Sequence, residues 1–143
     1  MKKLDRTRLL IELDKNNFEI FHYNDNECCI SLENDEEILV QLSRNSISRE
    51  HINLLKHILQ NHETYILNAV QHLKTFGIDI ENNYYVYGIY VGEFGFGAHG
   101  LHIFNGFTIS LKKWENIDPL NPDVFTVRFK CDGSPLGVDL WFE

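Results

Sequence analysis

The stretch of the chain richest in residues that could do chemistry is VGEFGFGAHGLHIFNGF, residues 91–107. Gly95, Gly97 and Gly100 have the G-x-G-x-x-G spacing of a dinucleotide-binding loop. Such a loop must open a helix, whose N-terminus then meets the pyrophosphate. The residues that follow, LHIFNGFTIS, are β-branched and aromatic, which is typical of a strand. The stretch therefore predicts a bend between two strands and no nucleotide site.

Two histidines of this stretch, His99 and His102, form an H-x-x-H pair with Glu93 nearby. On a strand, residues three apart point to opposite faces and cannot bind one metal ion. On a tight turn they could bind a divalent cation, with Glu93 as a third ligand. We interpret the pair as histidines at the rim of a sheet and expect no metal or other cofactor. A small-ligand or metal-binding enzyme that uses residues 92–102 stays as an alternative.

Nucleophilic side chains offer no catalytic arrangement. Cys28 or Cys29 could pair with His22, but the acidic residues around them do not lower a thiol pKa. With Cys131 the chain has three cysteines, an odd number that cannot all form disulfides within one chain. We interpret them as half-buried thiols in a reducing compartment. The G-x-S-x-G motif of a hydrolase is absent from the sequence, and we expect no catalytic residue.

The acidic residues are unevenly distributed along the chain. The net charge is −8, and residues 9–43, with nine acidic groups and one basic group, carry a charge of the same size. Such a surface repels nucleic-acid phosphates and attracts cationic proteins. The candidate partner-binding residues are Tyr23, Asp25, Glu27, Glu33, Asp35, Glu36 and Glu37. The aromatic anchors near them would be Tyr23, Tyr84, Tyr85, Tyr87, Tyr90 and Trp114. An ordinary solvated hairpin rim is the alternative interpretation of the acidic cluster.

The elements that must position these residues follow from the hydrophobic pattern. Strands are predicted at 18–23, 28–32, 38–42, 84–91, 107–114, 124–131 and 137–143. The segment 8–13 fits either a strand or a short helix. The order of hairpins, helix and strands predicts an α+β fold, a mostly antiparallel sheet with one long helix packed across one face.

That helix is predicted between the two groups of strands, where apolar residues recur at spacings of three and four. Ser48 is a suitable N-cap, and Gly77 a natural stop. Asn61 and His62 could divide the helix into two. The helix histidines fall outside the apolar stripe and are expected to be solvated; they are His51, His57, His62 and His72.

Length and composition predict a single domain over residues 1–143 with a substantial core. Hydrophobic residues make up 43% of the chain, which excludes the disordered class. No run approaches the roughly 18 apolar residues that cross a bilayer, and no cleavage site of a signal peptide follows the basic start. We expect a cytoplasmic protein.

Chain size, acidic N-terminal hairpins, the central helix INLLKHILQNHETYILNAVQHLKTFG and the closing pair FTVRFKCDGSPLGVDLWFE together resemble a known class. This class is the small acidic immunity proteins that bacteria pair with polymorphic or contact-dependent toxins. The resemblance is one of organisation over most of the chain. It implies a binding protein, without cofactor or catalysis, that neutralises a cognate basic toxin by covering its active site or an adjacent exosite. A structural, oligomerising domain with contacts through strand 84–91 or 137–143 is a further alternative.

Overall fold

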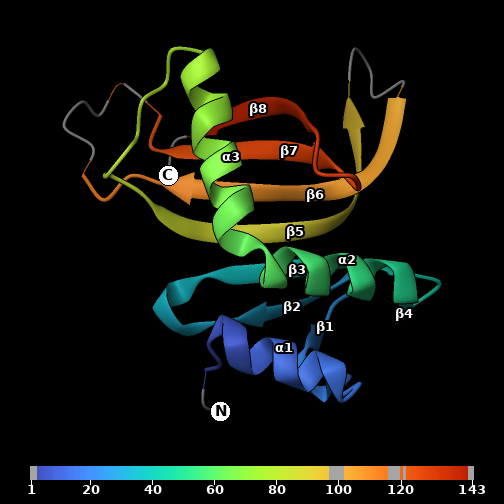
Figure 1. Ribbon diagram of the computed structural model, residues 1–143. Helices are drawn as coiled ribbons and strands as arrows, with labels where there is room; N and C mark the ends of the chain where they lie inside the picture. Colours follow the sequence, from blue (N-terminus) through green and yellow to red (C-terminus); the bar gives the residue numbers. More distant parts are fainter. Residues whose placement is uncertain (1–2, 97–101, 116–119, 121, 142–143) are drawn as a thin grey trace.

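The computed structural model describes residues 3–96, 102–115, 120 and 122–141 (Figure 1). This part of the chain forms three α-helices and an eight-stranded, mostly antiparallel sheet, so the predicted α+β class is confirmed. The helices are α1 (Arg6–Asp14), α2 (Arg49–Gln60) and α3 (His62–Thr75), with 3-10 turns η1 (Phe18–Ile20) and η2 (Glu33–Asp35). The strands are β1 (His22–Tyr23), β2 (Glu27–Ser31), β3 (Glu37–Ser43), β4 (Ser46–Ile47), β5 (Tyr85–Phe96), β6 (His102–Lys112), β7 (Val124–Lys130) and β8 (Pro135–Trp141). Among the described residues, no helix is long and apolar enough to cross a membrane.

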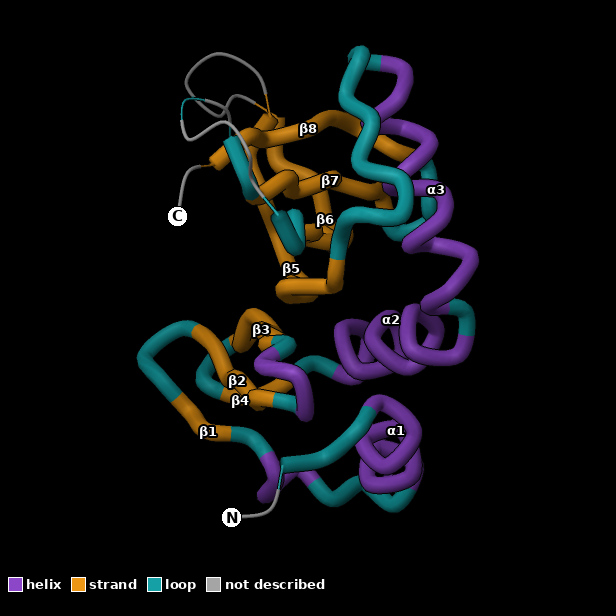
Figure 2. Tube along the Cα trace, turned by 90° about the vertical axis from the view of Figure 1, so that its left-hand side faces the viewer, coloured by secondary structure: helices purple, strands orange, loops and turns teal. Residues whose placement is uncertain are grey.

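The sheet has the strand order β1-β2-β3-β5-β6-β7-β8, and the short β4 pairs with β3. Neighbouring strands are antiparallel except β3 and β5, which are parallel. Parallel neighbours need a crossover connection, which α2 and α3 provide. All three helices lie on the same side of the sheet (Figure 2). The opposite side is called the outer face below.

Helix α1 occupies the segment for which the sequence allowed either a strand or a short helix. Asp5 caps α1 by accepting a hydrogen bond from the backbone N–H of Arg8 at 2.7 Å. Leu9 and Leu13, one turn apart, are fully buried, and α1 packs against α2. Burial of each leucine contributes about 1.5–3 kcal/mol. Because α1 precedes the hairpins, the predicted order of elements is wrong at its start.

The strand predicted over 18–23 forms only at its end. Phe18–Ile20 is a 3-10 turn, and β1 holds only His22–Tyr23. Bulky apolar residues occupy both sets of alternating positions in this segment, so a strand here would have no single face to bury against the core. Phe21, which follows the turn, is buried in the core instead of lying in a strand.

Two helices stand in place of the one long helix, and they meet at the predicted break. Ser48 caps α2, accepting a hydrogen bond from the backbone N–H of His51 at 3.0 Å. Asn61 leaves helical geometry with φ −121° and ψ 25°, and its side-chain amide donates to the His57 carbonyl at 2.9 Å. Gly77 has φ +77° just beyond α3, which confirms the predicted stop. The break lets α2 lie over β3 while α3 crosses β5 to β8 (Figure 1).

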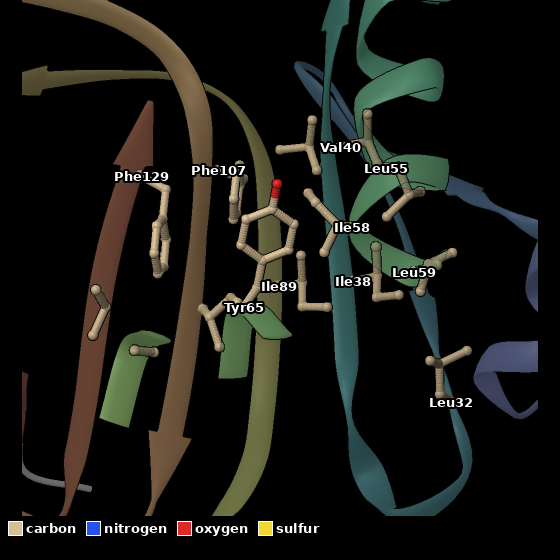
Figure 3. Packing of buried hydrophobic residues seen from close by; sticks show 14 of the residues in the cluster. Leu32, Ile38, Val40, Leu55, Ile58, Leu59, Tyr65, Ile89, Phe107 and Phe129 are labelled. Carbon is tan, nitrogen blue, oxygen red and sulfur yellow. The ribbon is translucent and has the colours of Figure 1, made fainter. Parts of the chain in front are cut away.

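The core fills the space between these helices and the sheet. Figure 3 shows an aromatic group, Tyr65, Phe107 and Phe129, beside an aliphatic group around Ile38 and Ile58. The Phe107 and Phe129 rings stack with centroids 4.8 Å apart, and the Tyr65 ring meets Phe107 edge-on at 5.1 Å. Aromatic pairs of this geometry are worth about 0.5–1.5 kcal/mol beyond their burial. One continuous core therefore joins α2, α3 and the central strands.

The histidines of the helices do not all face solvent. His51 is only 8% exposed, and its Nδ1 lies 3.1 Å from the carbonyl oxygen of Gln41 on β3. The expectation that it is solvated is wrong, because a polar ring with a backbone partner can be buried at the edge of a helix stripe. His57 is exposed as expected, and its Nε2 lies 2.8 Å from the Tyr65 hydroxyl.

Candidate protein-binding surface

The β2–β3 hairpin divides the acidic residues singled out in the sequence into two groups. Glu27 pairs with Gln41 at one end of the hairpin, and Ser31 pairs with Glu37 at the other. The four steps between Glu27 and Ser31 span roughly 13 Å of strand. Asp25 and Glu27 thus lie at one end, and the acidic residues from Glu33 onwards lie at the other. They do not form one cluster.

The first group lies beside the edge of the sheet. Tyr23 is 52% exposed, and its hydroxyl donates to the Phe18 carbonyl at 3.4 Å. Burial of part of the ring raises the pKa of Tyr23. Asp25 is exposed in the turn between β1 and β2, and Glu27 is half-buried on the outer face.

The second group sits on the η2 turn, which the N-terminal segment holds in place. Asn34 and Asp35 both adopt the left-handed region, with φ of 64° and 61°. The backbone N–H of Glu33 donates to the Leu4 carbonyl at 2.9 Å, and Lys3 Nζ lies 2.9 Å from Asp35 Oδ1. Glu33 and Asp35 are exposed, as is Glu37 at the start of β3. The turn and the start of β3 therefore display three carboxylates to solvent.

Glu36 is the exception, because its side chain points into the protein. It is 6% exposed, and its Oε2 lies 3.6 Å from Arg6 Nη1. Neither Glu36 Oε1 nor Arg6 Nη1 has a hydrogen-bond partner among the described residues. Burial raises the pKa of Glu36, and the Arg6 charge only partly offsets this. Glu36 is not part of the exposed acidic surface.

A hollow of about 210 Å³ opens on the outer face beside the exposed carboxylates of the η2 turn and is called the outer hollow. Its lining residues are Asp35, Glu37, Leu39, Tyr87, Gly88, Ile89, Tyr90, Thr108 and Ser110. A bulge between Val86 and Gly88 shifts the β5–β6 register at Tyr87, which is 39% exposed. Lys112 Nζ lies 5.7 Å from the centre of the Tyr87 ring. Acidic and aromatic side chains thus meet at this hollow.

The carboxylates affect titratable groups across the outer face. Burial, then Glu37 and Glu27, raise the pKa of Cys29. Burial, then Glu27 and Glu93, raise the pKa of Tyr90 on β5. The negative potential therefore extends from β2 to β5. Burial, the larger cause, and this potential together raise the pKa of Cys29 and so disfavour thiolate chemistry beside His22.

The glycine-rich stretch is described only at its two ends. β5 and β6 are antiparallel, with Phe96 paired to His102, so the two predicted strands are present but run further into the stretch than the turn predicted at 92–102 allows. Residues 97–101, and with them His99, lie outside the described residues, so the metal hypothesis stays a prediction. Within the described ranges, no group of three or more His, Cys, Asp or Glu side chains could hold a metal ion. Gly92 permits a close approach, because a Cβ there would lie 2.6 Å from the Gln41 side chain.

Of the two strands proposed for oligomerisation, one lies inside the sheet and the other at its end. The aromatic strand predicted at 84–91 lies in β5, which pairs with β3 on one side and with β6 on the other. The pairing with β3 covers residues 88–91, so strand addition is excluded only over those residues. β8 is the terminal strand of the sheet, and no other described strand pairs with its outer edge.

Three further side chains line the outer hollow and were not singled out by any sequence pattern: Leu39, Thr108 and Ser110. The pairing register of the strands brings them to the hollow.

Comparisons of this chain with protein-family models, with curated proteins and with solved structures find no match.

Proposed function

We propose that this protein is an immunity-type binding protein that neutralises a basic toxin domain by docking it against the η2 turn and the outer hollow. The observation that carries the proposal is the meeting of Asp35 and Glu37 with Tyr87 and Tyr90 at one hollow. Carboxylates accelerate the encounter with a cationic partner, and aromatic side chains supply the apolar contact that holds it. Neither alone makes an effective binding surface.

Glu33 and Glu37 are available to such a partner, whereas Asp35 already pairs with Lys3 at 2.9 Å, a contact that the partner would replace. Within the described part of the chain, no ion pair involves Glu27, Glu33 or Glu37. Like charges gathered at one end of a hairpin disfavour the folded state, so the presence of Glu33 and Glu37 there is not explained by stability. A cationic partner would relieve this repulsion on binding.

The proposal is tested by co-producing the chain with the C-terminal domain encoded by the gene immediately upstream of its own. We expect the chain to restore growth that this domain inhibits and to form a 1:1 complex with it. The triple variant Glu33→Lys, Asp35→Lys and Glu37→Lys, called the turn variant, is expected to lose this protection. Glu36 is left intact because it is buried.

A matched control distinguishes the effect of where the substituted carboxylates lie from the effect of the net charge. The triple variant Glu19→Lys, Glu50→Lys and Glu81→Lys, called the distant variant, changes the net charge by the same amount at exposed carboxylates elsewhere. We expect the distant variant to protect as the unmodified chain does. Growth inhibition that the unmodified chain leaves unchanged, or an upstream gene for a metabolic enzyme, would contradict the proposal.

A further inference from the structure

A second cavity lies on the helix side of the sheet, across the η2 turn from the outer hollow. Its volume is about 600 Å³, and it is called the inner cavity. Its lining residues are Arg6, Asn34, Glu36, His62, Glu63, Ile66, Leu67, Tyr84, Tyr85, Val86 and Trp114. Asn34 and Glu36 of the turn region face this cavity, while Asp35 and Glu37 face the outer hollow. The turn is therefore the partition between two concave sites.

One wall of the inner cavity is aromatic and is fixed by the chain itself. The Tyr85 and Trp114 rings lie 4.3 Å apart between centroids, tilted by 35°, and Trp114 is 68% exposed. Two hydrogen bonds tie the segments that carry them. Asn83 Nδ2 donates to the Glu115 carbonyl at 3.0 Å, and the Glu115 backbone N–H donates to Asn83 Oδ1 at 3.0 Å. Such preorganisation reduces the entropy lost on binding.

The polar lining is acidic overall. The charges of Arg6 and Glu36 offset each other at 3.6 Å, which leaves the exposed Glu63 as the net charge of the lining with histidines neutral. Glu63 is the second residue of α3 and lines the same cavity as the aromatic wall. A carboxylate beside flat aromatic faces is suited to a cation that can stack and donate hydrogen bonds at once.

We propose that the inner cavity receives the guanidinium group of an arginine side chain from the partner. The planar guanidinium stacks on Tyr85 and Trp114 and donates to the Glu63 carboxylate, which a compact ammonium group does less well. Ile66, Leu67 and Val86 contact the apolar stem of the arginine. This inference rests on the proposed function for the source of the arginine, and it adds a second contact on the far side of the η2 turn.

The test uses Trp114 as its own reporter. The Trp141→Phe variant keeps Trp114 as the single tryptophan, because the chain has two. Its fluorescence is titrated with N-acetyl-arginine amide, with the lysine counterpart, and with the citrulline counterpart, which is a neutral isostere of arginine. We expect saturable binding of the arginine probe with a Kd of about 1 mM, the range of a single side-chain contact. The lysine probe should bind about fivefold more weakly, and the citrulline probe should not saturate.

Two glutamates in equivalent positions provide the matched variants. Glu63 and Glu50 are each the second residue of a helix and are exposed, but only Glu63 lines the inner cavity. Glu63→Gln should weaken the arginine probe about fivefold, and Glu50→Gln should leave its Kd unchanged. Equal binding of arginine and citrulline, equal effects of the two variants, or no saturation would each overturn the inference. None of these results bears on growth protection by the η2 turn, so the two proposals fail separately.

Discussion

The outer face of the sheet has two regions whose polar side chains behave differently. On β6, β7 and β8, polar groups satisfy one another. The Ser110 and Thr126 hydroxyls lie 2.7 Å apart, and Arg128 Nε donates to Asp139 Oδ2 at 2.8 Å. On β2, β3 and β5, the carboxylates of Glu27 and Glu37 make no ion pair with any described residue.

This difference separates stability from binding on a single face. Side chains paired within the chain stabilise the fold, and of the four in the pairs on β6, β7 and β8 only Ser110 also lines the outer hollow. An unpaired carboxylate such as Glu37 beside the tyrosines of the outer hollow does the reverse, since repulsion from the other carboxylates of the hairpin opposes folding while it favours a cationic partner. We therefore expect substitutions in the paired region to change stability, and those in the acidic region to change binding.

The largest effect on stability is expected where the strands of the paired region approach most closely. A Cβ at Gly106 of β6 would overlap the Phe129 carbonyl oxygen of β7, whereas a Cβ at Gly88 would lie 3.0 Å from the Glu37 carbonyl oxygen. Gly106→Ala should lower the free energy of unfolding by about 3 kcal/mol and Gly88→Ala by about 1 kcal/mol. Urea unfolding of both variants measures this. An equal loss would remove the distinction between the regions.

A smaller effect follows from removing one charge in each region. Arg128→Ala leaves Asp139 without its partner and should lower the free energy of unfolding by about 1 kcal/mol, the pair being partly exposed. Glu37→Gln should change it by less than about 0.5 kcal/mol, because no pair is lost. Thermal unfolding of the two variants provides the comparison. A larger loss for Glu37→Gln would contradict the account.

The smallest effect concerns Glu36, the acidic residue that the fold buries. Its pKa is raised above 4.5, so the folded state binds the proton more tightly than the unfolded state. Its contribution to stability is therefore greatest below pH 4.5 and falls as the pH rises through the folded-state pKa. Glu36→Gln removes this dependence.

The stability of Glu36→Gln relative to that of the unmodified chain should thus be higher at pH 7 than at pH 4. Urea unfolding at the two pH values measures both differences. If the unmodified chain instead becomes more stable relative to the variant as the pH rises, the Arg6 charge affects the pKa of Glu36 more than burial does.

Local signals in the sequence predicted the helix ends but not the assembly of the sheet. Ser48 and Gly77 act as predicted because capping depends on a few neighbouring residues. The parallel pairing of β3 with β5 brings Leu39 opposite Tyr90 and so forms the outer hollow. That pairing joins residues about fifty positions apart, and no local pattern encodes it.

The burial of Glu36 was open to prediction from the sequence. Glu36 precedes Ile38 and Val40 at steps of two, and all three share the buried face of the hairpin. Glu36 stands between two other acidic residues, and the charge of this run suggested that the whole hairpin tip is solvated, so the two-residue spacing was not used. The strand predicted at 28–32 already placed Glu27 and the acidic residues within 33–37 at opposite ends of a hairpin, and the β2–β3 register confirms this separation.

The most direct measurement is the association rate of the protein with the toxin domain, followed by stopped-flow at increasing salt. For the unmodified chain and the distant variant, the rate should fall as salt screens the acidic surface. For the turn variant it should be about 10- to 100-fold slower at low salt and nearly independent of salt. Equal slowing of the two triple variants would show that net charge alone attracts the partner, and an unchanged rate for the turn variant would remove the η2 turn from the binding surface.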